Sequence, residues 1–96
     1  MKTNYQMLVE LNKEYTPARQ GIVSMTEIYL INEKLHLDEM DKLQLMNLRD
    51  FTVMFFNIEA DRAELESRTE CRKVIDKMSA IVSVIDQKLF NIGAEI

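Results

Sequence analysis

Residues 43–58, with the sequence LQLMNLRDFTVMFFNI, decide the fold of this chain. The segment holds three of the four phenylalanines, together with a large share of the big aliphatic side chains. A helix with one apolar stripe lies on a surface, whereas a helix that is apolar around most of its circumference must be covered on several sides. The segment therefore predicts a central helix that is covered by other helices or by a second chain.

The size and composition of the chain predict one small helical domain, residues 1–96. The single cysteine, Cys71, excludes an internal disulfide and suits a reducing compartment. The N-terminus lacks a secretory signal pattern, and no apolar run is long enough to span a bilayer. We therefore expect a cytoplasmic protein that does not enter a membrane.

Two amphipathic segments before residue 38 predict an N-terminal helical pair, residues 1–37. Apolar residues spaced by three and four indicate a helix over residues 4–15, with Thr3 or Asn4 as its N-cap. The second helix ends near residue 35. Its start is open between Pro17 and Ser24, because Gly21 interrupts the early part and residues 24–27 match a capping box.

The remaining residues, 38–96, predict a long antiparallel helical hairpin. Asp38 is the expected N-cap of a helix over residues 39–66. A second capping-box match at residues 67–70 marks the turn, and Gly93 is expected to end the last helix, residues 70–92. The apolar seam of that helix, at steps of three and four, consists of Ile75, Met78, Val82, Ile85, Leu89 and Ile92. Val74, Ile81 and Val84 broaden it into the wider apolar face of a bundle helix.

These segments together predict an all-α protein, a three- to four-helix bundle built on the long hairpin, with the N-terminal pair packed against the open end. The alternative is one continuous helix of more than fifty residues. The charged stretch at residues 59–73 would then be solvated between two apolar ends.

In the hairpin arrangement, residues 59–73 form a charged tip beyond the apolar body. Glu64 and Arg68 are spaced for an i,i+4 ion pair, and Glu70 and Lys73 for an i,i+3 pair. Such a tip is usually a solvated face, but arginines can also bind partner carboxylates in a bidentate manner. The candidate partner-binding residues are Arg62, Glu66, Arg68 and Arg72.

Glu33 and His36 form a Glu-x-x-His pair, the spacing found in metal sites of helical bundles. His36 is the only histidine, so a complete site would require a dimer interface. The two glycines stand apart and cannot form a phosphate-binding loop, and no catalytic constellation is visible. We expect a protein that is not an enzyme and takes no cofactor, with Glu33 and His36 as the metal-ligand alternative.

The formal net charge of −4 disfavours nucleic acid as a partner, because phosphate backbones require a basic face. Residues 18–37 can be compared with a helix-turn-helix, but they lack a basic recognition helix. A small DNA-binding transcriptional regulator is therefore only an alternative, and a metal-binding bundle is the second alternative. The sequence favours a small non-enzymatic interaction module, an adaptor, inhibitor or accessory protein. Its expected partner is another protein or a second copy in a homodimer.

Overall fold

The computed structural model describes residues 2–19 and 22–94, and these residues form four α-helices and one short 3₁₀ helix, without a β-strand. The elements are α1 (Asn4–Glu14), α2 (Met25–Leu35), η1 (Leu37–Glu39), α3 (Lys42–Glu64) and α4 (Arg68–Ala94). The predicted all-α class and the long helical hairpin are confirmed.

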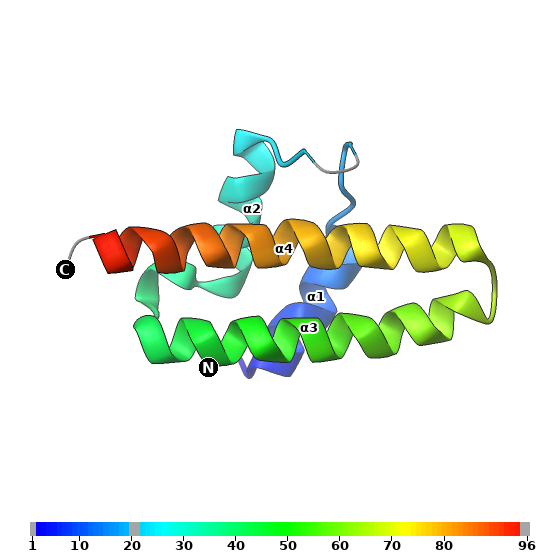
Figure 1. Ribbon diagram of the computed structural model, residues 1–96, viewed down its shortest axis with the longest axis horizontal. Coiled ribbons are helices and arrows are strands. Elements are labelled where there is room, and N and C mark those ends of the chain that lie inside the picture. The colour runs from blue at the N-terminus through cyan, green and yellow to red at the C-terminus, as the bar shows by residue number, and fades with distance from the viewer. Residues whose placement is uncertain (1, 20–21, 95–96) are drawn as a thin grey trace.

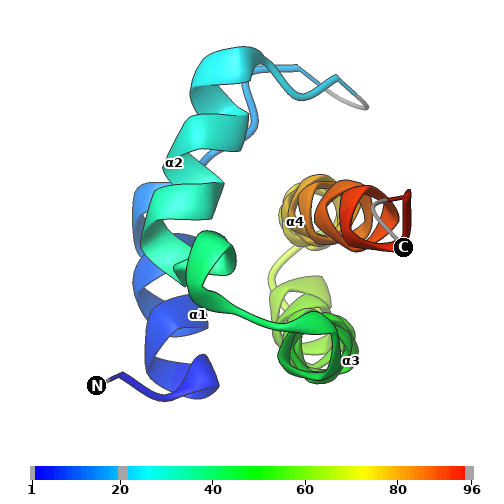
Figure 2. The same cartoon turned by 90° about the vertical axis from the view of Figure 1, so that its left-hand side faces the viewer.

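The helices lie in two layers. α3 and α4 run antiparallel along the longest axis of the molecule, and the turn between them lies at one end (Figure 1). α1 and α2 form the second layer, which crosses one face of this hairpin (Figure 2). The pair was predicted to cover the open end of the hairpin, yet Asn12 of α1 reaches Lys77 in the middle of α4.

The core lies between the two layers and along the α3–α4 contact. The ring of Phe55 meets the rings of Tyr5 and Phe56 edge-on, with centroids 5.8 and 5.0 Å apart. The largest fully buried side chains of the core are Tyr15, Phe56, Leu8, Leu11, Ile31, Leu35, Leu37, Leu45, Leu48, Ile81 and Ile85. Residues 43–58 thus supply the centre of the core, as predicted, although α1 and α4 leave part of the circumference of α3 uncovered.

Reciprocal side-chain caps fix the starts of the first two helices. Thr3 accepts a hydrogen bond from the backbone N–H of Gln6 at 3.2 Å, which decides between the two predicted caps. Ser24 and Glu27 form the capping box that the sequence indicated, so α2 begins after Ser24 and not at Pro17. Gly21, which was expected to interrupt this helix, lies outside the described residues.

The predicted cap of the central helix was wrong. Asp41, not Asp38, accepts the hydrogen bond from the backbone N–H of Gln44, at 2.8 Å. His36 ends α2 in the left-handed conformation, at φ 54°, and the fully buried Leu37 draws η1 inward. The chain therefore completes a 3₁₀ turn before α3 can begin at Lys42.

The last helix differs from its prediction in two respects. α4 starts at Arg68, and it continues through Gly93 to Ala94, so Gly93 does not end it. Within the predicted apolar face, Ile75 is 41% exposed, whereas Ile81, Val84 and Ile85 are buried. α4 contacts both α3 and α2. The turn at residues 65–67 rules out the single long helix.

Candidate interaction surfaces

The four predicted partner-binding residues lie together at the hairpin tip. Arg62 lies in the last turn of α3, Glu66 in the turn, and Arg68 and Arg72 at the start of α4; all four are exposed. Arg62 lies 3.6 Å from a carboxylate oxygen of Glu59. The structure thus gathers all four side chains at one end of the molecule, as the hairpin hypothesis requires.

Of the two ion pairs predicted at the tip, only one has the expected geometry. The ammonium of Lys73 lies 3.1 Å from a carboxylate oxygen of Glu70, the predicted i,i+3 pair. Glu64 and Arg68, however, belong to different helices, so their expected i,i+4 geometry does not exist. Leu65, in the turn between them, is 89% exposed. The tip is therefore a charged surface that also carries one uncovered aliphatic side chain.

The metal-ligand alternative finds little support in local geometry. His36 has left the helix at its left-handed position, so it no longer shares a helical face with the exposed Glu33. Its Nδ1 lies 3.7 Å from a carboxylate oxygen of Glu39. Among residues 2–19 and 22–94, no three histidine, cysteine or acidic side chains are grouped closely enough to hold a metal ion.

The face of the hairpin that points away from α1 and α2 carries partly uncovered apolar side chains. Phe55 faces Tyr5 of α1, and Val84 faces α2, which fixes the covered side of each long helix. Residues that lie about half a turn away from these positions point outward. We call them the outer face: Met46 and Val53 of α3, and Ile75, Val82 and Leu89 of α4.

The geometry of the outer face is regular. Its residues recur at steps of seven, so they stay on one side over about two turns of α3 and about four turns of α4. The Nε of Arg49 donates to Asp86 at 2.6 Å and links the two helices. Because Arg49 and Asp86 lie at the same level of the two antiparallel helices, Val53 lies opposite Val82, and Met46 lies opposite Leu89. Met46 and Ile75 are 46% and 41% exposed, and the other three residues are half-buried.

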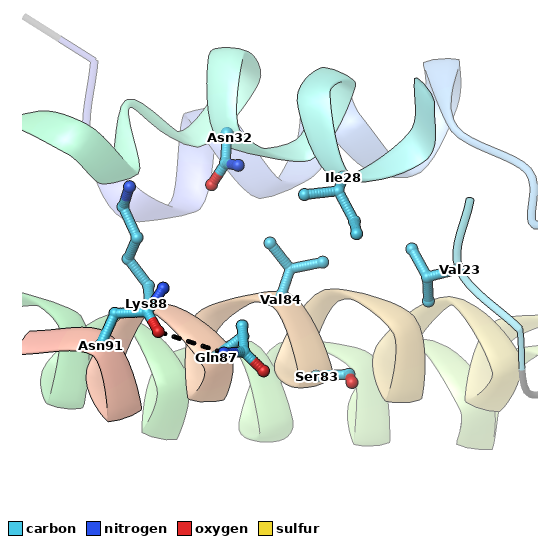
Figure 3. A pocket seen from close by; sticks show the side chains of 8 residues that line it. All are labelled: Val23, Ile28, Asn32, Ser83, Val84, Gln87, Lys88 and Asn91. Atoms are coloured by element: carbon cyan, nitrogen blue, oxygen red, sulfur yellow. Dashed lines mark hydrogen bonds between the residues drawn. The ribbon is translucent and has the colours of Figure 1, made fainter. Parts of the chain in front are cut away.

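A cleft of about 350 Å³ separates α2 from α4. Figure 3 shows Ile28 and Asn32 directed from α2 toward α4, and Val84 directed back from α4. The amide oxygen of Asn32 is buried, and no described residue donates a hydrogen bond to it. The cleft is lined by Val23, Ile28, Asn32, Ser83, Val84, Gln87, Lys88 and Asn91.

A larger hollow, of about 620 Å³, lies where α1, η1 and α3 meet. Met7 and Met40 supply its apolar wall, and His36 is at its rim. The amide of Gln44, which also lines it, already accepts a hydrogen bond from the backbone N–H of Asp41. No side-chain nitrogen or oxygen buried in this hollow is without a partner in the described part of the chain.

One buried polar pair joins the ends of α1 and α2. The hydroxyl of Tyr15 donates to the carboxylate of Glu27 at 2.5 Å. Burial, together with this bond, raises the pKa of Tyr15, and the bond lowers the pKa of Glu27 despite the opposing effect of burial. The capping-box pattern located Glu27, but no pattern in the sequence indicated that Tyr15 would reach it.

A second polar contact connects the layers. The ammonium of Lys77 donates to the backbone carbonyl of Asn12 at 2.9 Å and approaches its side-chain oxygen at 3.3 Å. Burial lowers the pKa of Lys77. Because Asn12 lies near the C-terminal end of α1, the cation also meets the negative end of that helix dipole.

Comparison with known protein families, with curated protein sequences and with solved structures finds no match to this chain. Within the described ranges, no helix combines the length and the apolar character needed to cross a membrane.

Proposed function

We propose that this chain is a small non-enzymatic helical interaction module that forms a homodimer through its outer face. The observation that carries the proposal is the uncovered apolar face of the hairpin. Two such hairpins packed face to face would complete a four-helix core, in which α3 is covered on the side that α1 and α4 leave open. The second copy is the chosen partner because it offers the same apolar surface in the same shape.

The outer face would supply about half of a typical stable interface. It spans Ile75 to Leu89 on α4, so it is about 21 Å long at 1.5 Å per residue. Two adjacent helices are about 20 Å wide, which gives roughly 420 Å² for each copy. A typical stable interface buries about 800 Å² per partner, so flanking residues of α3 and α4 would have to supply the rest. The Arg49–Asp86 pair balances its own charge, so it adds no net repulsion between the two copies.

The solution mass, measured by light scattering over a hundredfold concentration range, tests this proposal. We expect twice the chain mass of 11.3 kDa. Met46→Glu and Ile75→Glu should shift the protein toward the monomer, because each copy would bury an unpaired charge at the interface. Met25→Glu is the matched control, since Met25 is 79% exposed on α2, away from the outer face. Circular dichroism checks that each variant remains helical.

A wild-type monomer over the whole range would refute the homodimer. A dimer that both outer-face variants leave intact, but that Met25→Glu dissociates, would place the interface on the other layer and would also contradict the proposal. Arg72→Ala at the tip should leave the mass unchanged, because the tip is not part of the outer face. The tip residues Arg62, Glu66, Arg68 and Arg72 stay a prediction for contact with a different protein.

A further inference from the structure

The α2–α4 cleft has the features of a ligand site that is separate from the outer face. Val84, buried on α4, and the half-buried Val23 and Ile28 supply its apolar surface. Pockets that take small ligands typically start at about 300 Å³, and they combine an apolar lining with a few placed polar groups. The cleft, at about 350 Å³, has this size and composition.

The unpartnered oxygen of Asn32 indicates that a ligand of the cleft would carry a hydrogen-bond donor. A buried amide oxygen that lacks a hydrogen bond costs free energy, and a donor placed against it recovers that cost. Figure 3 shows the Asn32 side chain between the two helices, on the side of α2 that faces α4. The oxygen exposes almost no surface, so once the Asn32 side chain rotates toward the cleft, a ligand with one O–H group on an apolar body would satisfy this acceptor while it covers Ile28 and Val84.

The charges around the cleft favour a neutral ligand. Lys88, the one ionisable residue in its lining, pairs with Asp38 of η1. The remaining polar groups of the lining are uncharged: the hydroxyl of Ser83 and the amides of Asn32, Gln87 and Asn91. The Gln87 amide donates to Asn91 at 3.2 Å, which holds this edge in place. An anion would therefore compete with Asp38 for Lys88, whereas a neutral group meets no such competition.

We propose that the α2–α4 cleft binds a compact, uncharged apolar group that carries a hydroxyl donor, such as a phenol, with the hydroxyl bonded to Asn32 Oδ1. This chemistry occurs in free phenolic molecules and in tyrosine side chains. The site is independent of the homodimer, since α2 is in the layer opposite the outer face.

Titrations followed by ¹H–¹⁵N NMR test the proposal on the full chain with phenol and anisole. Anisole has the same ring but cannot donate, so we expect phenol to bind at least about tenfold more tightly. The shifts should saturate and should concentrate on Ile28, Asn32, Val84 and Gln87. Asn32→Leu should reduce the advantage of phenol to about twofold or less, whereas Asn57→Leu, on the exposed side of α3, should preserve it.

A second variant and a second probe keep the test decisive. Ser83→Phe places a ring at the mouth of the cleft, so it should abolish phenol binding even if Asn32→Leu perturbs the fold. N-acetyl-tyrosinamide then separates the two sources. Binding at least as tight as that of phenol indicates a tyrosine of a protein, and exclusion indicates a free small molecule.

Three results would overturn the proposal. Equal affinity for phenol and anisole would show that no hydrogen bond to Asn32 forms. Shifts that gather around Met7 and Met40 would place the ligand in the other hollow. The absence of any saturable shift at the cleft would show that the cleft does not bind a phenol.

Discussion

The bond between Tyr15 and Glu27 joins the end of α1 to the first turn of α2, and its removal tests how the N-terminal layer is held together. Tyr15→Phe deletes one oxygen and keeps the ring. Tyr15 is 2% exposed and Glu27 is 9% exposed, so water has little access to the carboxylate oxygen that loses its donor. A hydrogen bond to a charged group contributes about 1.5–3 kcal/mol. We expect Tyr15→Phe to lower the free energy of unfolding by that amount at neutral pH, and Tm by roughly 6–24 °C.

The same bond sets a pH dependence. Hydrogen bonding from Tyr15 lowers the pKa of Glu27 below its ordinary value of 4.5 in the folded protein. Between these two pKa values the unfolded chain binds more protons than the folded protein, so stability rises with pH. The contribution of Glu27 is complete above the unfolded pKa and is lost as the pH falls through the folded pKa. The difference between wild type and Tyr15→Phe should therefore be largest near pH 7 and should narrow in acid.

Urea unfolding followed by circular dichroism, at about pH 7 and about pH 3, measures both effects. Tyr29→Phe is the matched control: Tyr29 is 70% exposed, so its free energy of unfolding should change by no more than about 0.5 kcal/mol. If Tyr15→Phe unfolds at the same urea concentration as Tyr29→Phe at neutral pH, the buried bond contributes nothing and the reasoning is wrong.

Three further predictions concern the fold. Phe55→Ala should cost about 3–5 kcal/mol in urea unfolding, because a buried ring leaves a cavity, whereas Glu66→Ala at the tip should cost about 0.5 kcal/mol or less; equal small losses would contradict the hairpin core. Gly93→Ala should raise the free energy of unfolding by up to about 1 kcal/mol, seen as a slightly higher Tm, because Gly93 lies within α4 and a methyl group there meets nothing within 4 Å. A loss of stability would restore Gly93 as a helix stop. Asp41→Ala should cost about 1 kcal/mol in thermal unfolding through loss of the α3 cap, and Asp50→Ala, exposed within the same helix, should be near neutral; equal effects would remove the cap assignment.

Local patterns were sufficient to predict most of the fold. The capping box of Ser24 and Glu27, and the apolar density around Phe55, are properties of neighbouring residues, and the structure reproduces both. The Asp38 prediction failed because two aspartates stand three residues apart before α3. Only Asp41 has a glutamine three positions later to complete a reciprocal cap, and Leu37 must be buried first.

The exposure of Ile75 on α4 and the cleft could not be predicted in the same way. Spacing shows which residues of α4 share a face, but it does not show which of them the other helices cover. The cleft likewise combines Ile28 and Asn32 with Gln87, residues more than fifty positions apart. Neither the unpartnered oxygen of Asn32 nor the approach of Tyr15 to Glu27 leaves a periodic signal, because both depend on how two separate helices meet.

The direct succession of α3 and α4 affects the order in which the protein assembles. Their contacts begin beside the turn at residues 65–67, where loop closure costs little entropy, and then extend outward along both helices. The ribosome makes α1 and α2 first, yet Leu8 and Ile31 are buried in a core cluster that also includes residues of α3 and α4. We therefore expect the nascent N-terminal layer to stay unpacked until α4 leaves the exit tunnel, and so to need protection from aggregation during nearly the whole of synthesis.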